Sequence, residues 1–323
     1  YREVVGMQNF QMGAVISIVL LIPALLAFGL DQYSRKRQAS QLTSRSVVYV
    51  PNPDKVRDNL FFAYCLLITF LIVAMLGMAQ FGALVKFWPY NLSLTLKHYN
   101  FEVAGLGWDS FFNSVRMSLY AAFFGTILIF VGSYLIEKMR SDKSLRELLQ
   151  MVALMPMAIP GIVLGLAYIF FFNAKGNPLN FFYATMAILV VNTIVHFYTV
   201  SHLSAITAIK KLDDEFESVS LSLKIPTYKM FFRVTLPVCL PTVFDIFIYL
   251  FCNAMTTVSG VIFLYSYDTT LASVSAIHLD EQGDVAGAAA MAMLIVYISF
   301  VVRGLHTLIS TLLLKRTQAW RNI

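Results

Sequence analysis

Seven apolar runs, each of about 20 residues or more, dominate this chain and limit what it can fold into. They cover residues 11–30, 59–83, 112–135, 147–172, 180–204, 239–263 and 288–313. An α-helix of about 20 residues crosses the hydrocarbon core of a bilayer and satisfies its own backbone hydrogen bonds there. The runs therefore predict an all-α polytopic membrane protein with about seven transmembrane helices.

Composition supports this class and excludes others. The chain is 58% hydrophobic and only 13% charged, whereas a soluble domain carries about 25% charged residues. Its three cysteines, Cys65, Cys239 and Cys252, follow no spacing pattern and lie in or near apolar runs. They indicate small buried side chains rather than a disulfide framework, and no metal site or cofactor is expected.

The positive charges alternate from loop to loop. If the first span runs from outside to inside, 18 Lys and Arg residues fall in inner segments and four in outer segments. This is the bias of a protein whose basic loops stay in the cytoplasm. The net charge of +6 thus reflects topology, and no nucleic-acid partner is expected.

Residues 35–58 separate two units. The segment is basic and rich in serine and contains two prolines, which is typical of a linker. Residues 1–34 hold one span, and residues 59–323 hold six. The first and last spans both begin with small residues and end in basic tails, so we expect residues 1–34 to be the last helix of a preceding, equivalent half. The start at Tyr1, without a methionine, favours a longer original polypeptide.

The inner segment 205–237 is longer than a simple connection. It opens with four carboxylates, at Asp213, Asp214, Glu215 and Glu217, and acidic residues stabilise a helix N-terminus. Pro226 is expected to end or kink this helix. A second short helix is expected over about 227–235, with Lys229 and Arg233 on one face. The pattern predicts a helix–turn–helix on the cytoplasmic surface, and periodicity alone allows a simple interfacial loop equally well.

The same segment resembles the EAA loop of binding-protein-dependent ABC importer permeases of type I fold. Glu217 takes the Glu position, Ser218 and Val219 stand where alanines are usual, and Leu223 stands where the pattern has glycine. The aromatic is Phe231 or Phe232, Arg233 takes the basic position, and Leu236-Pro237 forms the ending. In that family the loop docks in a groove of the ATPase. The resemblance implies that Glu217, Ser218, Val219, Leu223, Lys224, Arg233, Leu236 and Pro237 couple this chain to an ATPase.

Two further stretches resemble the same family. Phe112-Asn113-Ser114-Val115 is similar to the start of its permease core, and 155–161 is similar to its proline-glycine span. Pro156 and Pro160 remove backbone donors inside a span and predict a broken helix. Gly161 and Gly165 form a small-xxx-small pattern, for which close helix packing is a simpler role than substrate contact.

Polar residues inside the spans give weaker indications. Thr256, Thr257 and Ser259 offer hydroxyls on a transport path, although hydroxyls also bond their own helix. Asn192 and His196 lie one turn apart, and we expect them to form buried interhelical hydrogen bonds. Asp245 and Arg303 place charge within apolar runs, for which a functional role is the default hypothesis.

The resemblance implies a transport permease of the bacterial inner membrane, with six spans forming the permease domain. Its expected partners are a cytoplasmic ATPase dimer, a periplasmic binding protein, a second permease half and the lipid bilayer. Several stretches, among them 256–266, look closest to 2-aminoethylphosphonate permeases, and ferric iron or polyamine permeases are the alternatives.

Three other classes remain open. The chain has no G-x-x-x-x-G-K-[ST] motif to hold a nucleotide phosphate, so ATP hydrolysis is expected in another chain and this one is not expected to be an enzyme. A secondary transporter would need charged residues at mid-membrane, and only Arg303 lies deep. A membrane enzyme would need a catalytic constellation, and a non-transporting scaffold would be indifferent to substitution of Glu217.

Overall fold

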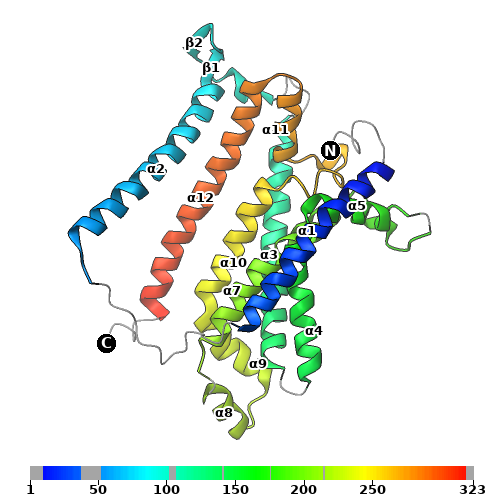
Figure 1. The fold of residues 1–323 in the computed structure, drawn as a ribbon, viewed down its shortest axis with the longest axis vertical. Coiled ribbons are helices and arrows are strands. Elements are labelled where there is room, and N and C mark those ends of the chain that lie inside the picture. The colour runs from blue at the N-terminus through cyan, green and yellow to red at the C-terminus, as the bar shows by residue number, and fades with distance from the viewer. Residues whose placement is uncertain are drawn as a thin grey trace.

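A computed structural model describes residues 10–37, 52–101, 107–139, 142–174, 176–213 and 215–317. Within them, five helices are long and apolar enough to cross a membrane, and two bent helix pairs bring the total to as many as seven. The straight spans lie in α1 (Phe10–Arg37), α2 (Lys55–Leu84), α3 (Asp109–Lys138), α10 (Leu236–Thr256) and α12 (Val285–Thr317). The predicted all-α membrane class and the number of spans are confirmed, and Figure 1 shows the helices running along the molecule's long axis.

Helix α3 forms the centre of the bundle, where α10, α7 and α6 pack against it. Small residues at its contact face, among them Ser118, Ala121, Ala122 and Gly125, are buried. A Cβ at Gly125 would lie 2.8 Å from Leu250 Cδ1 of α10. Small residues allow this close approach, which is how membrane helices gain packing energy without a hydrophobic driving force.

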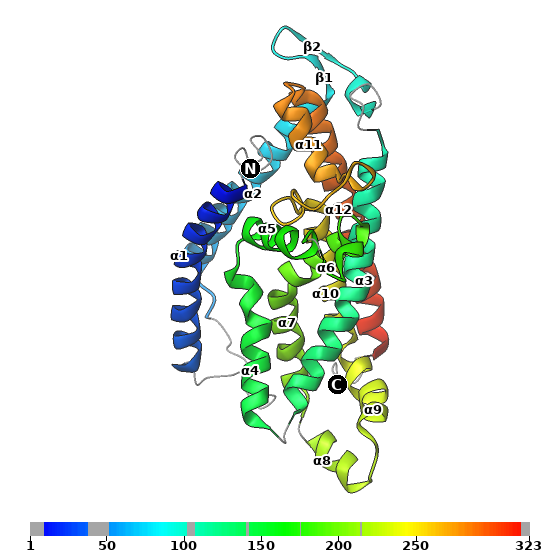
Figure 2. The ribbon, with the colours of Figure 1, turned by 90° about the vertical axis from the view of Figure 1, so that its right-hand side faces the viewer.

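The fourth span is broken, as Pro156 and Pro160 predict. Helix α4 (Lys143–Leu154) passes through the 3-10 turn η4 (Met155–Ala158) into α5 (Gly161–Phe172), with a bend of 108°. Pro160 is extended at φ −57° and ψ 140° and precedes the first residue of α5. Figure 2 shows α5 lying across the bundle at mid-height, so this span places a helix start inside the membrane region.

The fifth span is also bent, which the sequence did not predict. It begins at α6 (Met186–His196) after the 3-10 turn η5 (Asn180–Phe182) and continues in α7 (Tyr198–Lys210), bent by 54° at Phe197. Neither proline nor glycine lies at this point. Because α6 begins at Met186, the expected start of this span at residue 180 was six residues too early.

Helix α2 lies apart from the central bundle in Figure 1, and α1 lies at its edge in Figure 2. Helix α1 packs on α5 and η4 and buries Gly13 and Ser17. Helix α2 contacts α12, where the Tyr297 hydroxyl of α12 donates to Gln80 Oε1 of α2. From Lys55 to Leu71 all residues of α2 are exposed, so its inner half has no contact surface within the described residues.

The outer face carries structure that the sequence did not indicate. A small antiparallel hairpin, β1 (Val85–Phe87) and β2 (Asn91–Leu94), is followed by the 3-10 turn η2 (Lys97–Tyr99). Helix α10 ends at Thr256, not at the expected residue 263, and turns follow. The 3-10 turn η7 (Tyr267–Thr269) then leads to α11 (Ala272–Glu281).

Candidate coupling loop and transport path

The inner segment after α7 forms the predicted helix–turn–helix. Helix α8 (Glu215–Ser222) extends below the bundle in Figure 1 and is followed by α9 (Thr227–Met230). Asp213 Oδ1 accepts a hydrogen bond of 3.2 Å from the Glu215 amide, which supports the start of α8. The acidic first turn and the end before Pro226 agree with the sequence-based prediction; Asp214 lies outside the described residues.

The sharp turn after α8 lies at Lys224, not at Leu223. Lys224 has φ +53°, in the left-handed region that favours glycine. The Ile225 amide donates to the Ser220 carbonyl at 2.9 Å, which is the long bond of a Schellman helix end. The Leu223 amide still donates to the Val219 carbonyl, as in an α-helix. The backbone position that favours glycine is thus Lys224, one residue after Leu223, where the sequence comparison placed it. The chain makes a sharp turn there and does not continue as a helix.

The second short helix is not separate from the next span. Helix α9 continues through a π-helical turn, η6 (Phe231–Thr235), into α10, so that Thr227–Thr256 forms one helical span. Leu236 and Pro237 begin α10 inside this helix, so Pro237 lies within a continuous helical span, where its missing amide proton leaves one helical hydrogen bond unmade. The second short helix expected over about 227–235 is therefore the first part of a longer span. Lys229 and Arg233 are both exposed on it.

Glu217 faces the membrane domain. Its carboxylate forms an ion pair with the Lys138 ammonium at the inner end of α3, and the two side chains are only 13% and 17% exposed. Lys138 and Glu217 lie far apart in the sequence, so no local sequence pattern could predict this ion pair. The acidic residue of the loop motif is thus bound within this chain.

The remaining side chains of the loop fall into an anchored set and an exposed set. Phe231 is buried against Tyr134 and Phe130 of α3, with ring centroids 4.8 and 6.0 Å apart. By contrast, four apolar side chains on the protruding part are more than half exposed: Phe216, Val219, Leu223 and Tyr228. Ser218 and Lys224 are exposed beside them. We call these four apolar residues the loop patch.

The break in the fourth span brings three glycines together. A Cβ at Gly165 would lie 2.7 Å from the Gly260 carbonyl oxygen, and one at Gly161 would lie 3.2 Å from the Gly260 amide and collide with the Ser259 hydroxyl. The predicted close packing at Gly161 and Gly165 is confirmed, although its partner is the segment after α10 and not another helix.

The expected hydrogen bonds of Asn192 and His196 do not form within the described residues. Asn192 is 1% exposed, and neither its Oδ1 nor its Nδ2 has a hydrogen-bond partner there; the same holds for His196 Nδ1. The Asn192 amide instead packs against Gly260. Another histidine makes the interhelical bond: His202 Nδ1 of α7 lies 2.7 Å from the Ser133 hydroxyl of α3.

Comparison with known proteins identifies the family of this chain. Residues 128–315 match the family model described as "Binding-protein-dependent transport system inner membrane component". The chain belongs to this family. The matched range includes the helix–turn–helix, the broken span and the last two spans. The chain is therefore a protein of the inner membrane, and the predicted permease fold is confirmed.

The curated relatives of this permease are of two kinds. It is 25% identical over 94% of its length to the ferric transport system permease protein FbpB of Actinobacillus pleuropneumoniae, and covers 44% of that protein. It is 24% identical over 64% of its length to the putative 2-aminoethylphosphonate transport system permease protein PhnV of Salmonella typhimurium, and covers 77% of that protein. The chain therefore spans less than half the length of the ferric transport relative.

Among solved structures, the fold is similar to that of a bacterial ABC transporter involved in the import of the acidic polysaccharide alginate. The match has a TM-score of 0.66 at 18% identity and covers 79% of this chain and 96% of that chain. The same fold occurs in the MetNI methionine ABC transporter, with a TM-score of 0.52. These likenesses confirm the importer permease fold.

The three hydroxyl residues predicted along the permease's path have different surroundings. Thr256 is exposed at the end of α10, but its hydroxyl donates to the Cys252 carbonyl at 3.2 Å. Thr257 is buried, and its carbonyl accepts from the Ser273 hydroxyl at 2.6 Å. Ser259 is half-buried against Gly161. Of the three residues, Thr256 is thus the exposed one, and Thr257 is the most enclosed.

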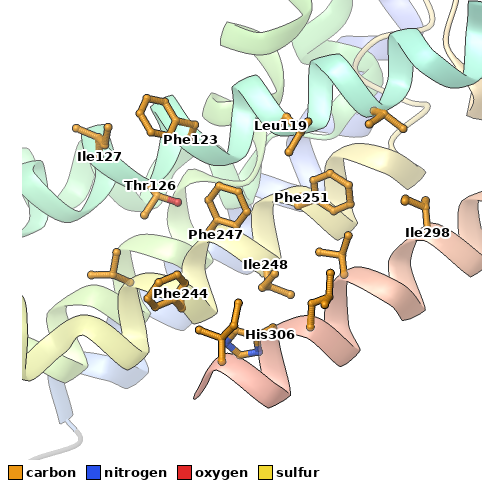
Figure 3. A pocket seen from close by; sticks show the side chains of 15 residues that line it. Leu119, Phe123, Thr126, Ile127, Phe244, Phe247, Ile248, Phe251, Ile298 and His306 are labelled. Carbon is orange, nitrogen blue, oxygen red and sulfur yellow. The ribbon is translucent and has the colours of Figure 1, made fainter. Parts of the chain in front are cut away.

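A separate apolar pocket of about 550 Å³ lies between α3, α10 and α12 (Figure 3). Phe123 and Ile127 of α3, Phe247 of α10 and Ile298 of α12 point into it. Thr126 and His306 supply the only polar side chains among its lining residues. Such a lining offers few hydrogen bonds to a hydrophilic cargo, so we do not take it as the transport path.

The two charged residues predicted within apolar runs, Asp245 and Arg303, have different surroundings. Asp245 Oδ1 lies 3.3 Å from His306 Nε2, with Asp245 65% exposed near the inner end of α10. This contact joins α10 to α12 below the pocket. Arg303 is exposed on α12, and no carboxylate of the described residues lies within ion-pair distance of it.

Proposed function

We propose that this chain is the membrane-spanning part of an ATP-driven ABC importer, and that the loop patch docks into a groove of a separate ATPase subunit. The observation that carries the proposal is the exposed loop patch, which lies on α8, the turn after it and α9, where the chain extends below the bundle in Figure 1. Exposing such residues to water costs free energy, which a docking partner removes. Membership in the binding-protein-dependent family supports the same conclusion.

In this proposal the loop residues have three different roles at the interface. Phe216, Val219 and Leu223 supply the apolar contact, and Ser218, Lys224, Lys229 and Arg233 surround it with polar and basic groups. Interfaces of this kind place apolar residues at the centre and polar ones at the rim. Glu217 acts on the other side, toward α3, and Leu236 with Pro237 starts the span that carries the loop.

Substitution of Val219 tests the ATPase interface. Val219→Glu places an unpaired charge in the apolar contact, and we expect the ATPase to be lost from the purified complex and ATP-dependent uptake to fall at least tenfold. Tyr267→Glu is the matched control, because Tyr267 is 89% exposed on the outer face. Retention of ATPase and uptake by Val219→Glu would contradict the proposed interface. Uptake that continues without any ATPase would favour a secondary transporter.

We also propose that α1 is the last helix of a preceding permease half, joined through residues 35–58 to the domain at 59–323. The support is its position: it packs on α5 and η4, at the edge of the six-span unit, and buries Gly13 and Ser17. The larger size of the ferric transport relative agrees with two halves in one polypeptide. Two such halves would enclose the path, and a periplasmic binding protein would deliver cargo to it.

For the cargo we propose 2-aminoethylphosphonate, the substrate class that the sequence favours and that the PhnV relatives carry in their names. Ferric iron is the second candidate, because the FbpB relative aligns over 94% of this chain. The measurement that decides is calorimetric binding of each compound to the cognate periplasmic protein. Tight binding of ferric iron and none of the phosphonate would overturn the first choice.

A further inference from the structure

Helix α3 is bonded at both of its ends to segments that lie on opposite faces of the membrane. It contains 30 residues, which corresponds to a length of about 45 Å. Figure 2 shows it extending from the level of α11 to the level just above α8. Few helices of the described chain combine this length with so large a buried face: 14 of its residues are buried.

At the inner end, two contacts join α3 to the coupling loop. The first is the ion pair between Lys138 and Glu217 of α8. The second is the packing of Phe231, just after α9, against Tyr134 and Phe130. Because both contacts are largely buried, a displacement of the loop changes the surroundings of α3 directly.

At the outer end, two buried side chains join α3 to the segment before α11. Asn113 Nδ2 donates to the Asp268 and Thr270 carbonyls, at 2.9 and 3.2 Å. The Ser114 hydroxyl accepts from the Ala272 amide, the first residue of α11, at 2.8 Å. Asn113 is 8% exposed and Ser114 1%. Ser114 thus accepts one of the amide protons that the start of α11 would otherwise leave unpaired, and Asn113 fixes the turn just before that helix.

We propose that α3 transmits conformational change between the coupling loop and the outer segment 268–281, with Lys138, Asn113 and Ser114 as positioning residues at its two ends. This inference rests on the proposed importer function. Cargo arrival at the outer face would bias the position of α3, and the loop would report that position to the ATPase. Coupling of this kind acts equally in both directions, because it is a free energy shared by the two sites.

Charge exchange tests the inner end. The complete transporter, with its second half, ATPase and periplasmic protein, is reconstituted in lipid nanodiscs, and ATP hydrolysis is measured with and without 2-aminoethylphosphonate-loaded periplasmic protein. If the binding measurement above selects ferric iron, the ferric form is used. We expect Lys138→Glu and Glu217→Lys each to lower the stimulation ratio at least fivefold, and the double exchange to restore it to within twofold of wild type. Failure of the double exchange to restore stimulation, with the complex assembled, would overturn the inner part of the inference.

Removal of the outer bonds tests whether α3 connects the two ends. Asn113→Ala combined with Ser114→Ala is expected to lower the same ratio at least fivefold. Thr199→Val is the matched control: its hydroxyl donates to the Ala153 carbonyl at 2.9 Å, a buried bond of the same kind that does not involve α3. We expect the control to keep the wild-type ratio.

The two ends together give the sharpest result. If α3 is a single connection, breaking the outer bonds in Lys138→Glu lowers the ratio no further than either change alone, because coupled sites are not additive. Fully multiplicative losses would show two independent effects and overturn the inference. A wild-type complex that shows no stimulation at all would instead contradict the importer function itself, so the two failures are distinguishable.

Discussion

Gly165 and Gly260 bring two backbones into direct contact at the break of the fourth span. A methyl group on Gly165 would meet a carbonyl oxygen that cannot rotate away. We expect Gly165→Ala to lower the stability of the protein by about 1–3 kcal/mol, as overpacking does. Gly77→Ala on α2 is the control, since nothing lies within 4 Å of its added Cβ, and it should be neutral or stabilising by up to about 1 kcal/mol. Thermal unfolding in detergent measures both, and equal effects would contradict the contact.

Asn192 is a second residue whose surroundings make a definite prediction. Its amide is buried in a membrane span with no hydrogen-bond partner among the described residues, and an unpaired amide of this kind costs about 1–3 kcal/mol. Asn192→Leu has a similar size and no polar atoms, so we expect thermal stability to rise. Asn253→Leu serves for comparison, because the Asn253 amide donates to the Tyr249 carbonyl at 2.7 Å, and it should not stabilise. A loss of stability in Asn192→Leu would show that the amide is paired in the membrane.

At this scale the sequence predicts which residues are unusual better than it predicts their partners. Glu217 was identified from its motif, and Asn192 and His196 from their polarity inside a span. The partner of Glu217 comes from another helix, 79 positions earlier in the chain, since 217 minus 138 is 79. Pairing of this kind depends on how helices pack, which no local pattern contains.

The end of α8 shows how a single backbone position controls an element. Lys224 adopts a left-handed conformation, which costs a non-glycine residue about 1–2 kcal/mol. We expect Lys224→Gly to keep the turn and to be neutral or stabilising by up to about 1 kcal/mol, because the greater freedom of glycine in the unfolded chain offsets part of the gain. Lys224→Val should weaken the turn and lower both stability and uptake. Thermal unfolding and transport assays on the two variants check this, and a harmful glycine would show that the Lys224 side chain itself is required.

Elements defined by proline were predictable, and elements defined by tertiary contacts were not. Pro156 and Pro160 break the fourth span at the expected place because they remove backbone donors. The bend at Phe197 has no such residue. Helix α11 was not predicted from the sequence, and the Ser114 hydroxyl of α3 accepts from its first amide, 158 positions away in the chain.

The orientation of the whole molecule can be checked directly. The charge distribution places α8 in the cytoplasm and α11 outside. We expect a cysteine at Glu281, which is exposed at the end of α11, to react with a membrane-impermeant maleimide in intact cells. A cysteine at the exposed Lys229 should react only after permeabilisation, and the unsubstituted chain, with Cys65, Cys239 and Cys252, gives the background. The reverse labelling pattern would invert the topology and remove the ATPase-docking role of the loop.

For the molecule as a whole, the count of spans follows from the sequence because hydrophobic length sets it, and the charge distribution predicts their orientation. The arrangement of the spans does not follow, since any apolar face can pack against another. Helix α2 illustrates this: it is among the most apolar spans, yet none of the residues in its spanning window is buried in the described structure.

The π-helical turn at Phe231–Thr235 has a consequence for insertions and deletions. One extra residue is accommodated there, shown by the Leu236 amide, which reaches back five positions to the Phe231 carbonyl. Removing one residue from this turn would restore an ordinary helix but rotate everything before it by about 100° relative to α10. Phe231 would leave its place beside Tyr134, and α8 would present Glu217 away from Lys138. The exact chain length between the loop and the membrane span is thus as much a part of the coupling device as any side chain in it.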